Sequence, residues 1–292
     1  MVFEQLIVNG IIAGSEYALL AIGLTLIFGI LRLIHFAHGE VAMVGAYSAF
    51  VVSNIFGFPL LLGFVAAIVV GTILGLAINK IAFRPLRSQH ILMPLIAAVA
   101  VSILLQNIIA LIFGNEIKTY NLGPVEKGIE ISSFIITKTQ ILIIVVALAL
   151  MLLTWFLMKK TKTGQQVQAV ADNRHLAESI GIDTEKVINI TFGFGSALAA
   201  AGGVLIAMET NLEPMMGLMP NIKAFAAIIV GGVGSVPGAI LGSYFIGLAE
   251  NIGIWYLPSG YKDAIAFFIL IIFLLFKPTG IMGKKKEGVQ ND

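Results

Sequence analysis

The chain has 292 residues, of which 58% are hydrophobic and 12% are charged, and its mean hydropathy is +0.98. Soluble domains carry about 25% charged residues, so this composition excludes an ordinary soluble protein and indicates a polytopic membrane protein. A net charge of +2 is too small to suggest a nucleic-acid partner, and the absence of cysteine excludes disulfides and thiolate metal sites.

Charge-free stretches long enough to cross a bilayer, about 20 residues each, occur throughout the chain. In chain order we expect crossings near residues 6–31, 40–56, 59–83, 91–113, 139–158, 188–209, 237–256 and 262–277. Residues 223–235 must also carry the chain back through the membrane. They are too few for an ordinary span, so they predict a broken helix buried in protein. The predicted fold is an all-α polytopic membrane protein with about eight or nine transmembrane helices, some broken or re-entrant, in one domain over residues 1–292.

The loops predict the orientation, because cytoplasmic loops are enriched in lysine and arginine. Basic residues gather in FRPLRSQH at 83–90, in KKTKTG at 159–164 and in KKKE at 284–287, whereas the loops at 114–138 and 209–222 are mixed or acidic. We therefore expect the N-terminus outside and the C-terminus in the cytoplasm, with a basic cytoplasmic tail at 278–292.

The stretch LRLIHFAHGE places Arg32, His35, His38 and Glu40 within nine positions, beside Gly39. Ionisable groups inside a membrane are costly and usually face a pathway or one another. The alternative is a short turn in water at the inner end of the first crossing, with Arg32 as an interfacial anchor. Both interpretations stay open. The spacing matches no zinc motif, so no metal site is predicted, and no serine is paired with a base for catalysis.

A second unusual stretch reads VGGVGSVPG and contains Gly231, Gly232, Gly234 and Pro237. Glycine and proline together disfavour a continuous helix, so this stretch predicts a break whose backbone polar groups face a cavity. No lysine follows the glycines, so it is not a phosphate-binding loop. The other glycine cluster, at 193–203, is predicted to be a helix-packing face.

The most polar loop covers residues 159–187 and contains a predicted amphipathic helix with one narrow apolar face. Gly181 suits the C-terminus of that helix. The helix could lie on lipid headgroups or dock on a cytoplasmic partner, and the residues alone do not decide between the two.

Five segments together resemble the membrane subunits of branched-chain amino-acid ABC importers of the LivH type. They are GLTLIFGILRLIHFAHGEVAMVGAY, FRPLR, QAVADNRHLAESIGI, AAIIVGGVGSVPGAILG and FKPTGIMG, and they span the chain in the order found in that family. His35 departs from the family pattern, which usually has asparagine there.

The resemblance implies a permease subunit rather than an enzyme, without a cofactor. Its partners would be a second related permease subunit, two ATPase subunits that bind ATP, and an extracytoplasmic binding protein, all at a bacterial inner membrane. The translocation path or helix breaks would involve His35, His38, Gly39, Glu40, Gly231, Gly232, Gly234 and Pro237. A path for urea or short amides is an alternative, and an ion-coupled carrier is another.

By the same resemblance, residues 164–181 become a coupling helix that docks on an ATPase subunit and transmits its closure during alternating access. Asp172 and Arg174 would make its polar contacts. The helix is bounded by Gly164 and Gly181, and its packing face consists of Ala171, Leu176 and Ala177.

Overall fold

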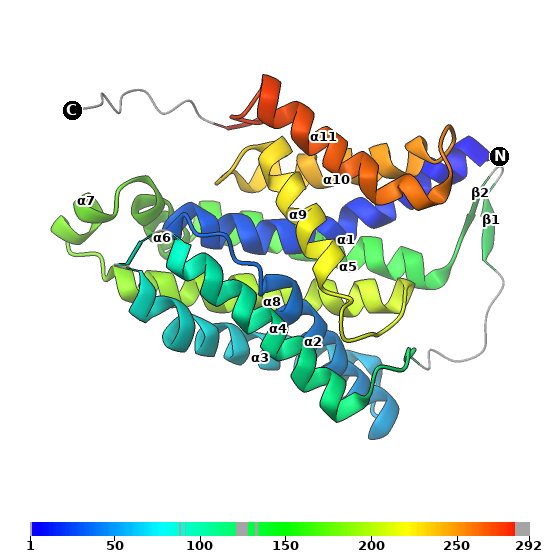
Figure 1. The fold of residues 1–292 in the computed structure, drawn as a ribbon, viewed down its shortest axis with the longest axis horizontal. Helices are drawn as coiled ribbons and strands as arrows, with labels where there is room; N and C mark the ends of the chain where they lie inside the picture. Colours follow the sequence, from blue (N-terminus) through cyan, green and yellow to red (C-terminus); the bar gives the residue numbers. More distant parts are fainter. Residues whose placement is uncertain (1, 88, 91, 121–127, 132–133, 284–292) are drawn as a thin grey trace.

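The computed structural model describes residues 2–87, 89–90, 92–120, 128–131 and 134–283 (Figure 1). The KKKE run and the rest of the predicted tail beyond residue 283 lie outside the described residues. The α-helices are α1 (Val2–Leu31), α2 (His38–Phe50), α3 (Leu60–Ile78), α4 (Leu92–Phe113), α5 (Lys138–Lys160), α6 (Lys162–Asp172), α7 (Arg174–Ser179), α8 (Thr184–Glu209), α9 (Leu218–Gly231), α10 (Val236–Gly253) and α11 (Lys262–Phe276).

Shorter elements extend these helices or close the loops between them. The π-helical segment Val51–Ile55 continues α2, Asn79–Phe83 continues α3, and 3-10 turns occupy Arg84–Leu86 and Ser259–Tyr261. An antiparallel hairpin pairs β1 (Ile129–Ile131) with β2 (Phe134–Ile136). The side chain of Gln5 bonds both the amide and the carbonyl of Ile135, which fixes this hairpin to the start of α1.

Six helices among the described residues are long and apolar enough to cross a membrane, and counting the bent pair α9–α10 as one span brings the number to seven. The predicted all-α membrane class is confirmed, and so is a broken span, because α9 and α10 meet at 117°. The number of spans is lower than the eight or nine expected. The difference lies at α2, which is not among the helices that are long and apolar enough, and at α9, whose 14 residues count only as part of the bent span with α10.

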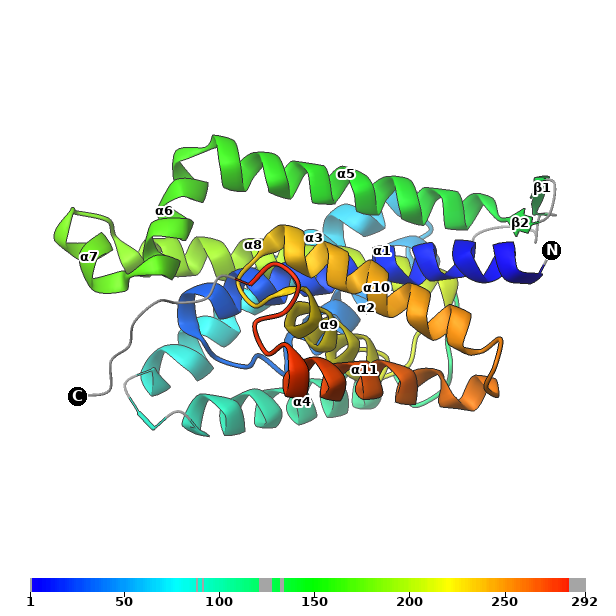
Figure 2. The ribbon, with the colours of Figure 1, turned by 90° about the horizontal axis from the view of Figure 1, so that it is seen from above.

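Two helices form the centre of the molecule. The most apolar windows of α1 and α8 are 89% and 83% buried, whereas those of α3, α4 and α5 are 28% buried or less. Figure 2 shows α5 along one side of α1, and α4 and α11 along the other. The outer helices therefore present their apolar side chains to lipid or to other subunits.

Small residues let the neighbours of α8 approach it closely, as predicted for the glycine cluster at 193–203. Gly45 of α2 and Gly71 of α3 both face Ala200, and Gly203 faces the backbone of Ala42. The hydrophobic effect does not drive helices together in lipid, so the van der Waals contacts that small residues allow are a main source of packing energy there.

We predict that Gly203→Ala destabilises the protein, because the added Cβ meets the backbone of Ala42 rather than a flexible side chain. Overpacking of this kind costs about 1–3 kcal/mol. Thermal unfolding of the purified protein measures the effect. The matched control is Gly260→Ala, whose Cβ meets nothing within 4 Å among the described residues. Equal melting temperatures for the two variants would contradict the packing.

Candidate functional sites

The first candidate site is the segment between α1 and α2. The chain leaves α1 at Leu31, turns at the exposed Arg32 with φ +51°, and runs back into the protein (Figure 1). His35 and His38 are 1% and 0% exposed, and Glu40 is 1% exposed. Of the two interpretations left open by the sequence, the structure excludes a turn in water for His35 to Glu40.

The two histidine rings lie in an aromatic cage. Their centroids are 5.5 Å apart, and the ring of His35 packs edge-on against Phe83 at 4.9 Å and lies 5.7 Å from that of Phe192. His35 precedes the first turn of α2 instead of sharing a helix face with His38. Neither ring nitrogen of His35 has a hydrogen-bond partner among the described residues, whereas the ring of His38 lies against the backbone of Leu20 in α1.

Glu40 and Gly39 join α2 to two other helices. One carboxylate oxygen of Glu40 accepts hydrogen bonds from Ser102 at 2.9 Å and from Gln106 at 2.8 Å, both on α4. Gly39 packs directly on the backbone of Gly217 at the start of α9, where only a residue without a side chain fits. Glu40 therefore bonds α4, and not Arg32.

Asn221 of α9 completes this region. Its side-chain amide donates to the carbonyl of Phe36 at 2.7 Å, which supplies a partner for backbone outside a helix. A cavity of about 180 Å³ lies beside His35, Phe36 and Asn221. Buried polar atoms without a partner are rare, and here they gather at one break, which makes the region a candidate part of a transport path.

The second break contains the glycine-rich stretch and has the predicted geometry. Gly232 and Gly234 take φ values of +113° and +82°, which side chains disfavour, and Ser235 and Pro237 begin α10. Gly231 packs on the backbone of Gly238, so the backbones of the two helices are in contact there.

At the α9 end of this break, contrary to the prediction, the carbonyls of Val230 and Gly231 bond to protein instead of facing a cavity. The amides of Ile281 and Met282 donate to the carbonyls of Val230 and Gly231, each at 2.8 Å. The last described segment thus folds back over the C-terminus of α9 and satisfies carbonyls that a helix end leaves free. The same two hydrogen bonds hold the FKPTGIMG stretch, residues 276–283, against the end of α9.

A third polar cluster was missed in the sequence. Lys223 of α9 lies 3.1 Å from Glu250 of α10 and 2.7 Å from Asp263 of α11, and Tyr17 of α1 donates to Glu250 at 3.1 Å. Glu250 is fully buried. The signal was present: Lys223 and Glu250 bracket a charge-free stretch that contains the glycine break, and a fold at that break brings opposite charges together.

The predicted coupling helix consists of two helices, α6 and α7, rather than one. Asn173 between them is extended, and its side chain caps α7 by accepting from the amide of Leu176. Gly164 is buried against the end of α5, and Gly181 has φ +86° just after α7. The segment from Gly164 to Gly181 is therefore a compact pair of helices, and the second of them is capped by Asn173.

The apolar residues of α6 and α7 divide into two groups. Ala177 is 2% exposed and packs inside the chain with Val167 and Val170, so its assignment to an outward packing face is wrong. Leu176 and Ile180 are 65% and 75% exposed, which leaves an apolar pair one helical turn apart on the surface. Ala171 is half-buried and Asp172 is exposed.

A charge cluster centred on Glu185, at the start of α8, holds α7 to the body of the protein. The carboxylate of Glu185 lies 2.8 Å from Arg87, 3.4 Å from Arg84 and 3.6 Å from Arg174. Arg174 therefore pairs within its own chain. The hydroxyl of Thr184 and the guanidinium of Arg174 both donate to Glu178 and hold the pKa of that carboxyl below its ordinary value.

The fold and these sites define a polytopic helical membrane protein whose broken helices enclose buried polar groups. Among the described residues no group of three potential metal ligands is present. This is the architecture of a transport component.

Comparisons with known proteins identify the family. The model of the permease component of branched-chain amino-acid transport systems matches residues 6–274. The chain is 39% identical to the permease BraD of Pseudomonas aeruginosa and 38% identical to LivH of Escherichia coli K12, with 97% of this chain and 96% of each relative covered. The chain belongs to this family, so it is the permease component of an ABC transport system and is not itself an enzyme.

A solved ABC transporter of metal-chelate type, in an inward-facing conformation, has a similar arrangement with a TM-score of 0.48 and 17% identity, covering 92% of this chain and 85% of that one.

We predict that Lys223→Met destabilises the protein by about 3–5 kcal/mol, because it leaves the carboxylate of Glu250 buried without its counter-ion. The double variant Lys223→Met/Glu250→Gln should recover much of that loss, since it removes both charges. Thermal unfolding in detergent measures all three proteins. A double variant as unstable as the single one would show that the ion pair is not what holds these helices.

Proposed function

We propose that this chain forms half of the translocation path of an importer for branched-chain amino acids, beside a second related permease subunit. Two ATPase subunits bind the α6–α7 side, and an extracytoplasmic binding protein delivers the amino acid to the opposite side. The observation that carries the proposal is the match to BraD and LivH over 97% of the chain, breaks included.

The orientation follows from the distribution of basic residues. The N-terminus and the β1–β2 hairpin lie outside, and α6 and α7 lie in the cytoplasm with the C-terminus. Figure 1 shows α6 and α7 at one end of the molecule. Arg84 and Arg87 pair with Glu185 at the start of α8, next to α7, and the lysines at 159–162 lie where α5 meets α6, in keeping with the excess of basic residues in cytoplasmic loops.

The exposed pair Leu176 and Ile180 enters a groove of an ATPase subunit, with Asp172 at its edge. Closure of the ATPases on ATP moves α6 and α7. The contacts of Glu185 with Arg174, Arg84 and Arg87 carry that movement to α8 and to the end of α3.

Within the membrane, alternating access opens the path to one side at a time. The buried segment at 33–40 and the break at 231–237 lie where α1, α2, α9 and α10 change direction, so these helices are the ones that move. The path tolerates a zwitterion with an apolar side chain, and the binding protein sets the choice of substrate.

We predict that the double substitution Leu176→Ser/Ile180→Ser weakens association with the ATPase subunits about tenfold or more, because it removes the apolar anchors of the interface. Co-purification of the subunits from detergent measures association. The control is Ile117→Ser, which is equally exposed at 65% but lies in the loop after α4. Unchanged association would contradict docking through this pair.

The function is tested by reconstituting the chain with the products of its neighbouring genes and measuring uptake of labelled leucine into proteoliposomes. We expect uptake that requires ATP, the binding protein and every subunit. Uptake of urea or a short amide in place of leucine would change the substrate. Uptake by this chain alone, driven by an ion gradient, would contradict the importer.

A further inference from the structure

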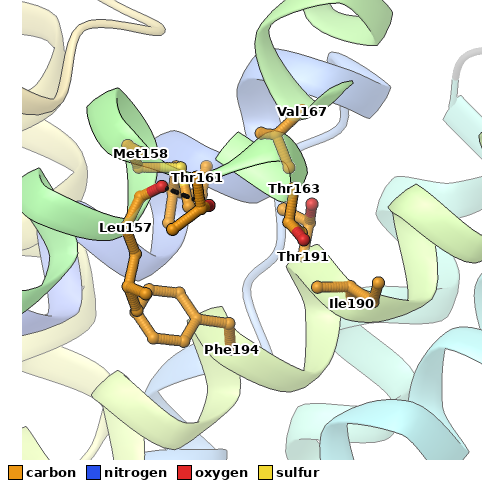
Figure 3. A pocket seen from close by; sticks show the side chains of 9 residues that line it. Leu157, Met158, Thr161, Thr163, Val167, Ile190, Thr191 and Phe194 are labelled. Carbon is orange, nitrogen blue, oxygen red and sulfur yellow. Dashed lines mark hydrogen bonds between the residues drawn. The ribbon is translucent and has the colours of Figure 1, made fainter. Parts of the chain in front are cut away.

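A second cavity, of about 210 Å³, lies where α5 turns into α6 (Figure 3). Leu157, Met158 and Thr161 form its wall at the end of α5. The other walls come from Thr163 and Val167 of α6, Leu26 of α1, and Ile190, Thr191 and Phe194 of α8. This volume exceeds the roughly 150 Å³ at which an apolar cavity in a protein binds a benzene-sized guest.

The lining is apolar although it includes threonines. The hydroxyl of Thr161 donates to the carbonyl of Leu157 at 2.7 Å, and that of Thr191 donates to the carbonyl of Val187 at 2.9 Å. Two of the three threonine hydroxyls in the lining are thus satisfied within the chain, Thr163 contributes the third, and the rest of the cavity offers methyl and aliphatic groups to a guest. A hydrocarbon chain suits such a surface, whereas a polar metabolite does not.

Positive charge surrounds the same turn. Lys159, Lys160 and Lys162 are exposed, and none of them forms an ion pair among the described residues. The ammonium of Lys159 lies 5.7 Å from the ring centroid of Trp155, which is 43% exposed. Tryptophan beside lysine at the end of a membrane helix is typical of the headgroup level, so the cavity opens near the membrane surface.

We propose that this cavity is a binding site for an anionic phospholipid. One acyl chain occupies the space between α5, α6 and α8, and the phosphate headgroup lies among Lys159, Lys160 and Lys162. The lipid is anionic because basic residues near the membrane surface attract such headgroups, each contributing roughly fivefold in affinity. The site needs only the membrane location of the chain, and it does not depend on the proposed substrate or partner subunits.

The site adjoins α6, whose second residue, Thr163, is part of the cavity wall. A lipid bound here fills the space between the end of α5 and α8, and so supports the position of the α6–α7 unit.

Native mass spectrometry of the purified full chain tests the proposal, with phosphatidylglycerol and phosphatidylcholine of identical acyl chains titrated in parallel. We expect phosphatidylglycerol to bind more than tenfold tighter to the wild type. The triple variant Lys159→Gln/Lys160→Gln/Lys162→Gln should lose that preference and keep weak binding of both lipids. Inorganic phosphate at matched concentration should not displace the lipid, because it lacks the acyl chain.

Filling the cavity should abolish retention of both lipids at this site. Thr163→Phe is the first variant, and Ile190→Phe, at a position 39% exposed, is the second should Thr163→Phe fail to fold. The control Leu152→Phe lies on the exposed side of α5, outside the cavity. Equal binding of the two lipids by the wild type would overturn the proposal. So would unchanged retention in a folded cavity-filling variant, or full displacement by phosphate alone.

Discussion

A backbone amide or carbonyl inside a bilayer must find its hydrogen-bond partner within the protein, and this requirement governs the two helix breaks, between α1 and α2 and between α9 and α10. Between α1 and α2, the carbonyl of Phe36 accepts from the side chain of Asn221. After α9, the carbonyls of Val230 and Gly231 accept from the amides of Ile281 and Met282. Each break is thus stabilised by a segment far away in the sequence, which ties the start, the middle and the end of the chain together.

Composition predicted the membrane class, and glycine with proline predicted the position of the break at 232–235, because both signals are local. The number of spans was overestimated, since apolarity alone does not tell a short buried helix such as α2 from a crossing. Burial of His35 and the pairing of Lys223 with Glu250 depend on contacts between distant helices. The only local hint of the ion pair was that Lys223 and Glu250 lie at the two ends of the charge-free stretch that contains the glycine break.

The helices α6 and α7 show the same difference between what the local sequence predicts and what depends on distant contacts. The amphipathic pattern of 164–181 located the helical region, and the cap made by Asn173 explains why it forms two helices. The pattern could not separate Ala177, which packs against its own chain, from Leu176, which remains exposed. Glu185 joins α7 to the end of α3 and to α8, a link between three elements that the local pattern does not contain.

Cysteine accessibility tests most directly whether the segment at 33–40 is buried inside the protein, and the chain has no native cysteine to interfere. Arg32→Cys, His35→Cys and His38→Cys would each be treated with a membrane-impermeant maleimide in inside-out and right-side-out vesicles. Rapid labelling of position 32 from one side only, with position 35 and position 38 protected from both, is the predicted result. Labelling of position 35 as fast as position 32 would place the segment in water and contradict the buried break.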